Sequence, residues 1–486
     1  MSKSHMCLFV LMISMAQLCA QAGIGQTLAT SREIGTTFGV VNTRNLTWAL
    51  AGYGLAIGSF MLMAGRLGDI YGHKKVFLAG FVWSAIWSAV SGAAFYSTYA
   101  LFVFSRVFHG LGVAASVPNG LALIGIACPP GKQKAMAFTF ITMMGPVGII
   151  FGSVSASLLA SAWWPVTYWA STGMLLTIAG LGHLIIPKAA QEDKLPNSIT
   201  AFMTELDLPG AITGTSALVL ISFAWNQAPL VGWKEPYLWI ALIIGSILAV
   251  LFGLIESYYA PKPLIPVYVL KLEVCLILFT GACGWSCFGI WAFYTWQFVE
   301  NIRGASPLLA AAYVSPCIIV GCLATLSMSL VLHRLGALMI VSLSLLSFTL
   351  GSALVVTMPA IQSYWSQLFI SVLVVSWAMD TGFPITALTI SNVAKRKDQG
   401  MAASLVSTAM NYSISVGLGI ARTVESYVNR SGKSTENKLI GYRAALYTAL
   451  GLAGLGTLIC FAFLSKTLLR ERGKLYSRFR ITGRKS

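Results

Sequence analysis

The sequence is poor in charge: Asp, Glu, Lys and Arg make up only 10% of its 486 residues, and only 15 residues are acidic. A soluble domain carries about 25% charged residues, so this chain could not cover the surface of a water-soluble fold. Hydrophobic residues make up 57% of the chain, and no strand-like alternation of apolar and polar residues interrupts them. The composition therefore indicates an all-α polytopic membrane protein.

Two further absences exclude other classes of protein. No G-x-x-x-x-G-K phosphate-binding motif occurs, which argues against an ATP-driven pump. The five histidines are scattered over different spans and loops: His5, His73, His109, His183 and His333. They form no cluster of the kind that binds a metal or performs catalysis. We therefore expect no metal, no cofactor and no enzymatic activity.

Apolar runs recur along the whole chain, each long enough to cross a hydrocarbon core of about 30 Å as a helix. We count fourteen of them, near 6–26, 46–64, 76–94, 100–127, 135–160, 167–186, 209–227, 237–256, 274–296, 306–331, 337–357, 365–391, 400–421 and 441–464. Their grouping predicts a six-helix bundle (1–186), a linker with an inserted helix pair (187–271), a second six-helix bundle (272–464) and a basic cytoplasmic tail (465–486).

The basic residues predict the orientation. Most of the 32 Lys and Arg residues fall on the side that carries both termini, so we expect both ends in the cytoplasm. The net charge of +17 then reflects topology and attraction to the membrane surface, and no nucleic-acid partner is expected. The sequence N-R-S at Asn429 lies on the predicted outer side and is a candidate glycosylation site. We expect a monomer in the plasma membrane, with the vacuolar membrane as the alternative.

The short predicted loop "GRLGDIYGHKK" (65–75) has more structure than a simple connection needs. Gly65 and Gly72 permit a tight turn between two helices. Asp69 is expected at the start of the third helix, where the helix dipole favours negative charge. Lys74 is expected to anchor the cytoplasmic edge.

This loop resembles the signature loop of the major facilitator superfamily, roughly G-x-L-x-D-R-x-G-R/K-K. The matching residues are Gly65, Leu67, Asp69, Gly72 and Lys74. Ile70 replaces the usual arginine and His73 replaces a basic residue, so the sequence departs from the family's full charge relay at these two positions. The resemblance implies the major facilitator fold and transport by alternating access.

The segment "SRVFHGLGVAA" (105–115) is similar to the R-x-x-Q-G motif of proton-coupled antiporters, with His109 in place of glutamine. Arg106 lies inside a predicted span, stays charged there and needs an acceptor. It could face the transport cavity, or it could simply bind a backbone carbonyl. His109 could titrate near neutral pH, or it could donate one structural hydrogen bond.

The fifth predicted span begins with Gly145 and Pro146, where a proline is expected to kink the helix. Gly148 and Gly152 then form a G-x-x-x-G face for close packing. The stretch partly resembles the G-P-x-x-G-G motif of antiporters. With fourteen spans, the whole chain resembles the fourteen-span drug:proton antiporters. Within them it looks like the fungal branch of aminotriazole-resistance, boron-export and low-affinity ammonium transporters.

Asp380 lies in the middle of a predicted span, without Lys or Arg nearby in sequence. A carboxylate there can bind either a proton or a cationic solute, which suits an exchanger. It could also form a static pair with a buried arginine, or orient a substrate without coupling. Gln17 and Gln21 line one face of the first span and Asn411 lies on a polar face of the thirteenth. These residues either contact the solute or join helices.

The favoured function is proton-coupled efflux of a small organic compound, such as a drug, a toxin or a secondary metabolite. An aromatic cavity is expected from Trp285, Trp291, Tyr294 and Trp296, although such residues also anchor span ends. The alternative is a facilitator of a small polar solute such as ammonium or boric acid. The lack of an aspartate in the first span favours this alternative. A nutrient sensor is less consistent with the short tail.

Overall fold

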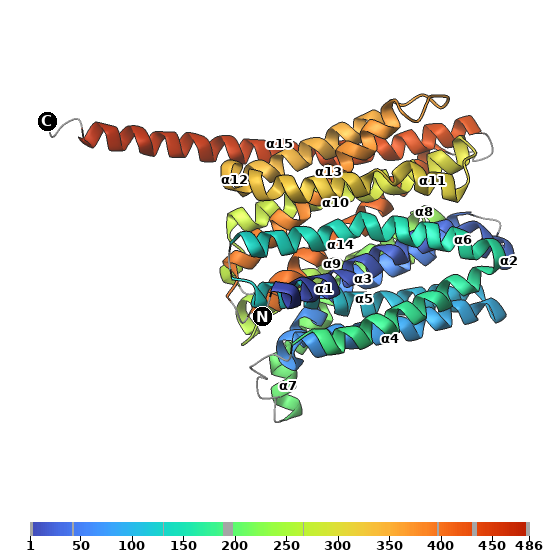
Figure 1. Ribbon diagram of the computed structural model, residues 1–486, viewed down its shortest axis with the longest axis horizontal. Coiled ribbons are helices and arrows are strands. Elements are labelled where there is room, and N and C mark those ends of the chain that lie inside the picture. Colours follow the sequence, from blue (N-terminus) through green and yellow to red (C-terminus); the bar gives the residue numbers. More distant parts are fainter. Residues whose placement is uncertain are drawn as a thin grey trace.

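The computed structural model describes residues 3–40, 43–129, 131–187, 198–265, 267–395, 398–429 and 435–482. Within these ranges the regular structure is helical, without strands. Long helices lie side by side in one bundle, as Figure 1 shows. Their apolar sequences explain this arrangement, because backbone groups in a membrane must bond within their own segment. The prediction of an all-α polytopic fold is confirmed.

The N-terminal part contains α1 (Lys3–Ala29), α2 (Ser31–Thr37), α3 (Thr43–Tyr71), α4 (His73–Ala93), α5 (Tyr99–Ala127) and α6 (Lys132–Ile185). In α6 the backbone leaves the helical region only at Trp163, which is extended with φ −167° and divides the element into two helices. The helical backbone continues through Pro146. The break in α6 therefore comes after the fifth predicted span, and not at its proline.

The middle part contains α7 (Ile199–Leu206), α8 (Leu208–Val231) and α9 (Pro236–Leu254). A π-helical turn (Ile255–Tyr259) follows α9, and a 3₁₀ turn (Val267–Val269) lies in the connection to the next helix. Helices α8 and α9 pack against each other, and α8 also packs against α3 and α14. Through α8, the pair therefore contacts one helix of the N-terminal part and one of the C-terminal part.

The C-terminal part contains α10 (Leu272–Gln297), α11 (Pro307–Val314), α12 (Cys317–Val356), α13 (Gln367–Val393), α14 (Gln399–Val428) and α15 (Thr435–Thr482). A non-helical residue, Gly336 with φ 72°, divides α12. Helix α15 runs beyond the predicted end of the last span and projects from the bundle (Figure 1). The described part of the predicted tail is thus continuous with the last helix.

Twelve segments of the described chain are long and apolar enough to cross a membrane. One of them is the whole of α6, with 54 residues. Helix α14, with 30 residues, is not among the twelve. It carries the polar face expected for the thirteenth span and packs against α3, α8 and α10. The count of fourteen spans remains a prediction.

The bundle has two distinct ends. At the first, the His5 ring lies 2.9 Å from the Ile185 carbonyl, and Lys74 binds the carbonyl of Ile186. This end carries the 65–75 loop, and we call it the loop end. At the opposite end, the far end, Ile34 packs in an aromatic cluster with Phe102, Trp164 and Tyr168. Helix α1 runs from the loop end to the far end.

Glycines bring α1 and α6 into direct backbone contact. A Cβ atom on Gly148 would collide with the carbonyl oxygen of Leu18, and one on Gly152 with that of Ala22. In the reverse direction, a Cβ on Gly25 would collide with the Ile149 carbonyl. The structure therefore places the predicted G-x-x-x-G face at a helix contact, as small residues allow within membranes.

Candidate functional site

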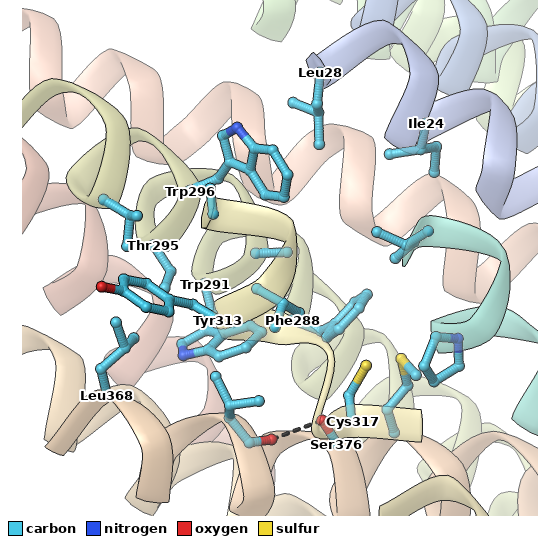
Figure 2. A pocket seen from close by; sticks show the side chains of 18 residues that line it. Ile24, Leu28, Phe288, Trp291, Thr295, Trp296, Tyr313, Cys317, Leu368 and Ser376 are labelled. Atoms are coloured by element: carbon cyan, nitrogen blue, oxygen red, sulfur yellow. Dashed lines mark hydrogen bonds between the residues drawn. The ribbon is translucent and has the colours of Figure 1, made fainter. Parts of the chain in front are cut away.

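A cavity lies between the two halves of the bundle, as Figure 2 shows. It holds about 770 Å³ of space free of atoms, its open mouth included. From the N-terminal half it is lined by Ile24, Leu28, Pro146 and Ile149. Its aromatic side chains are Phe288, Trp291, Trp296 and Tyr313, from α10 and α11. Such a largely apolar pocket with few polar groups is typical of small-molecule sites.

Two of the four aromatic residues expected at a cavity do line it, namely Trp291 and Trp296. The indole nitrogen of Trp291 donates to Ser371 over 2.9 Å, which fixes the ring in place. Trp285 packs instead against Phe288, with ring centroids 5.2 Å apart. The hydroxyl of Tyr294 donates to a carboxyl oxygen of Glu425 over 2.7 Å.

Asp380 is fully buried on α13, directly after Met379, which lines the cavity. Neither of its carboxyl oxygens has a hydrogen-bond partner among the described residues. Oδ2 lies 3.0 Å from the point where a Cβ on Gly321 would stand. The side chain of Met143 lies 3.2 Å from the same point. The carboxyl group is thus surrounded by α6 and α12, next to the cavity and without a basic partner in the described structure.

Arg106 is also fully buried, on α5, but it binds its own half of the bundle. Nη2 donates to the carbonyl of Gly23 on α1 over 2.7 Å. The guanidinium carbon lies 4.5 Å from the ring centroid of Tyr53 and 5.7 Å from that of Tyr168. These contacts match the alternative of a backbone hydrogen bond. They do not show the static pair with Asp380 that the sequence left open.

His109 lies one turn after Arg106 and is 3% exposed. Its Nδ1 lies 2.8 Å from Nη1 of Arg106. Because arginine can only donate, Nδ1 must accept, and the proton of the ring is on Nε2. His109 is therefore a neutral imidazole in this state, oriented by Arg106 and by an edge contact with Tyr53 at 5.5 Å.

Gln17 and Gln21, on one face of α1, lie close to the residue that precedes Asp380. A Cβ on Gly145 would lie 3.7 Å from Nε2 of Gln17, 3.9 Å from Cγ of Gln21 and 4.0 Å from Cε of Met379. The structure thus brings α1, α6 and α13 together one residue from Asp380. Asn411 lies elsewhere: it donates to the Ser407 carbonyl over 2.9 Å at the contact between α3 and α14.

The 65–75 loop makes the tight turn that its glycines predict, with Gly72 at φ 91°. The expected place of Asp69 was wrong: it lies in the last turn of α3 and not at the start of α4. Asp69 Oδ1 lies 3.3 Å from Nε2 of His73, whose Nδ1 lies 2.7 Å from the amide oxygen of Asn119. Both ring nitrogens of His73 therefore lie beside an oxygen atom of a neighbouring side chain. Lys74 donates to the His183 carbonyl over 2.8 Å.

This loop also touches the other half of the bundle. A Cβ on Gly400, at the start of α14, would collide with Asp69 Oδ1 and lie 2.6 Å from Cε1 of His73. A Cβ on Gly65 would lie 2.6 Å from the Ser404 side chain. The two halves are therefore closed on each other at the loop end. The cavity, which includes Leu28 from the last turns of α1, lies nearer the far end.

Sequence reasoning missed a buried arginine in the C-terminal half. Arg422 lies just past the predicted span 400–421, but α14 continues to Val428 and leaves the side chain 6% exposed. Its guanidinium carbon lies 4.7 Å from the ring centroid of Phe293. Arg422 lies seven residues after Ser415, so it continues the polar face of α14. That spacing was the signal that could have revealed it.

Asn429 caps the C-terminus of α14 and is 7% exposed, and a Cβ on Gly441 would lie 2.9 Å from its Cβ. The rest of its sequon lies outside the described residues. A glycan at Asn429 would require this segment to move away from α15. Glycosylation remains a prediction.

Comparisons with known proteins agree with this geometry. The model of the Major Facilitator Superfamily matches residues 6–418. The chain is 40% identical over 468 residues to a low affinity ammonium transporter of Saccharomyces cerevisiae, covering 96% of this chain and 90% of that protein. It is 39% identical over 458 residues to the efflux pump terJ of Aspergillus terreus, covering 94% and 87%.

An aminotriazole resistance protein of Saccharomyces cerevisiae is 34% identical over 474 residues, covering 96% of this chain and 85% of that protein. Among solved structures, the human organic anion transporter MFSD10 superposes with a TM-score of 0.60 at 17% identity, covering 93% of this chain and 98% of the other. That likeness supports the fold alone. The family model and the relatives together show that this chain is a membrane transporter, not an enzyme, and belongs to the Major Facilitator Superfamily.

Proposed function

We propose that the chain exports a small, largely apolar organic compound in exchange for protons, with Asp380 as the proton carrier. The observation that carries this proposal is the buried carboxyl group of Asp380, without a hydrogen-bond partner in the described structure and next to a cavity between the two halves. An isolated charge inside a membrane protein is costly, and such residues usually mark ion or substrate pathways. Relatives named as efflux pumps or multidrug transporters support the direction and the substrate class.

The chemistry of the cavity supports an organic substrate. Its aromatic walls offer large, rigid apolar surfaces, and Thr295 and Ser376 are among its few polar groups. Gln17 and Gln21 lie near Met379 and could bind a solute that reaches beyond the cavity toward Asp380. A compound with an apolar body and a basic or polar end fits these surroundings.

Alternating access supplies the coupling. In this structure the loop end is closed by the contacts of Gly65 and Gly400. Opening that end requires the two halves to rock apart there and to close at the far end, as in transporters with the binding site between two bundles. If Asp380 binds either a proton or the substrate, each exchange carries one inward and the other outward.

We further propose the arrangement of the chain in the membrane. The loop end, with Lys74 and Lys75, would face the cytoplasm together with both termini, as the distribution of basic residues favours. The predicted boundaries at 186, 271 and 464 would separate the two bundles, the inserted pair and the tail. The plasma membrane is the expected location, and the transporter would work as a monomer.

The second candidate is a facilitator of ammonium or another small polar solute. The relative named a low affinity ammonium transporter favours it, as does the lack of an acidic residue in α1. An uncoupled carrier needs no proton site. Asp380 would then only orient the solute.

The test uses purified protein in proteoliposomes, with internal pH followed while a lipophilic azole-like cation, boric acid or ammonium is offered with and without a proton gradient. The wild type is compared with Asp380→Asn and with Glu273→Gln, which neutralises an exposed carboxylate on α10. Solute-dependent proton movement that only Asp380→Asn abolishes supports exchange. Transport that needs no gradient and survives Asp380→Asn supports the facilitator.

A further inference from the structure

The inserted helix pair contains two buried carboxyl groups that the proposed transport site does not use. Asp207 caps the N-terminus of α8 and is 4% exposed. Glu256 lies in the π-helical turn after α9 and is 8% exposed. Both lie toward the loop end, where α7 leads into α8. Two acidic side chains so deeply buried require either partners or neutralisation.

One oxygen of each carboxyl group is satisfied by the backbone. Asp207 Oδ1 accepts from the Gly210 amide over 3.3 Å, and Glu256 Oε2 accepts from the Ile265 amide over 3.1 Å. The other two oxygens, Asp207 Oδ2 and Glu256 Oε1, are buried and have no hydrogen-bond partner among the described residues.

These two remaining oxygens point to one place. A Cβ on Gly210 would lie 2.9 Å from Glu256 Oε1 and would collide with Asp207 Oδ2. Both oxygens therefore lie within 2.9 Å of the same point. The backbone of Asp207 adopts φ 49° and ψ 60°, and no other non-glycine residue of the described chain has a positive φ. The fold thus brings together two groups that would repel each other if both were ionised.

The charged groups of the neighbouring elements do not neutralise this pair. Lys262, in the connection after α9, forms an ion pair with Glu205 of α7. Arg66 of α3 donates to the backbone carbonyl of Glu205 over 2.8 Å. Lys395, before α14, lies over the ring of Tyr268 at 5.0 Å. Asp398, also before α14, accepts from the hydroxyl of Tyr268, and no ion pair joins a described basic residue to either carboxyl group.

We propose that Asp207 and Glu256 form a buried proton site, in which the two carboxyl groups share one proton. Two carboxylates in contact cannot both ionise in a site of low polarity, so one proton stays bound to the pair. That proton supplies the donor that the two remaining oxygens otherwise lack.

The site has a structural consequence for the closed state. Glu256 binds the amide of Ile265, and three residues later Tyr268 donates to Asp398 over 2.6 Å. Asp398 immediately precedes α14, whose second residue is Gly400, at the contact with Asp69. These contacts link the proton site to the connection before α14, next to the contact that closes the loop end. Loss of the proton introduces repulsion between Asp207 and Glu256, and we expect that repulsion to loosen this end.

The proton is tested by infrared spectroscopy of the full chain in lipid, which detects the carbonyl stretch of a protonated carboxylic acid. The measurement uses the Asp380→Asn background, so that the proposed carrier contributes nothing. Asp207→Asn keeps a side chain that can cap a helix, and Glu256→Gln keeps the shape of the glutamate. Glu273→Gln is the control, because it removes an exposed carboxylate.

At neutral pH we expect Asp207→Asn and Glu256→Gln each to abolish one protonated-carboxyl band that the control retains. The apparent Tm of the background protein should fall as the pH rises from acid toward neutral, because over that range the folded state keeps a proton that the unfolded chain has released. In Glu256→Gln the apparent Tm should depend less on pH over the same range. An unchanged infrared band in both variants would overturn the proton site. Loss of the band on addition of Ca²⁺, together with a rise in Tm, would also overturn it, because it would indicate a cation site.

Discussion

The contact between α1 and α6 yields a prediction with a matched control inside a single element. In Gly152→Ala the added methyl group would collide with the Ala22 carbonyl oxygen and lie 2.6 Å from its Cα and 2.8 Å from its carbonyl carbon. Carbon atoms normally pack about 3.5–4.0 Å apart. The two helices must therefore separate by about 1 Å, because the obstructing atoms belong to the backbone and cannot rotate away.

Overpacking of this kind costs about 1–3 kcal/mol. In Gly173→Ala, also within α6, the methyl group meets no atom within 4 Å. That substitution should stabilise the helix by roughly 0.5–1 kcal/mol, because alanine loses less entropy than glycine on folding. The expected difference between the two variants is therefore about 1.5–4 kcal/mol.

The assay is unfolding of the purified protein in mixed micelles by a denaturing detergent, followed by tryptophan fluorescence. Gly152→Ala should also transport more slowly, since α1 and α6 carry Ile24 and Pro146 of the cavity wall. Equal stability of Gly152→Ala and Gly173→Ala would refute the reasoning, because it would mean that the helices are not in backbone contact.

Three further predictions concern other contacts. Arg106→Lys should lower the free energy of unfolding by about 1–3 kcal/mol in the same assay, because it loses the stacking on Tyr53 and the hydrogen bond to the Gly23 carbonyl; a stability equal to wild type would contradict it. Gly400→Val should push α14 from Asp69 and open the loop end, so that a cysteine introduced there reacts faster with a thiol reagent; unchanged reactivity would count against it. Burial, followed by the bond to Asp398, raises the pKa of Tyr268 to about 12, so this hydroxyl should remain a donor at neutral pH and lose the bond only as pH approaches that value. Tyr268→Phe should therefore lower stability by less than about 1 kcal/mol, equally at pH 6 and pH 9.

The sequence predicted features that depend on residues close together in the chain. Apolar runs predicted the helical spans, because a membrane permits few other structures. The spacing of Gly148 and Gly152 predicted a packing face, and Gly72 predicted a tight turn. The helix against which Gly148 and Gly152 pack was not predictable, because their contacts on α1 lie more than a hundred residues away in the sequence.

Long-range contacts also account for what was missed. Arg106 needed an acceptor, but nothing in its own helix indicates the carbonyl of Gly23. Asp207 and Glu256 lie 49 positions apart in the numbering and meet only because α8 and α9 pack antiparallel at their ends. Arg422 was misplaced because a charged residue normally ends an apolar run, whereas α14 continues and buries it.

The close packing of α1 against α6 and Arg106 affects how such a transporter can change its substrate range under selection. Glycine contacts with α6 and the bond from Arg106 hold α1 firmly to its own half, so Ile24 and Leu28 form a wall of fixed shape. The opposite wall is formed chiefly by the aromatic side chains of Trp296 and Tyr313, on α10 and α11. Mutations that adapt the cavity to a new substrate should therefore accumulate on α10 and α11, while α1 stays constant.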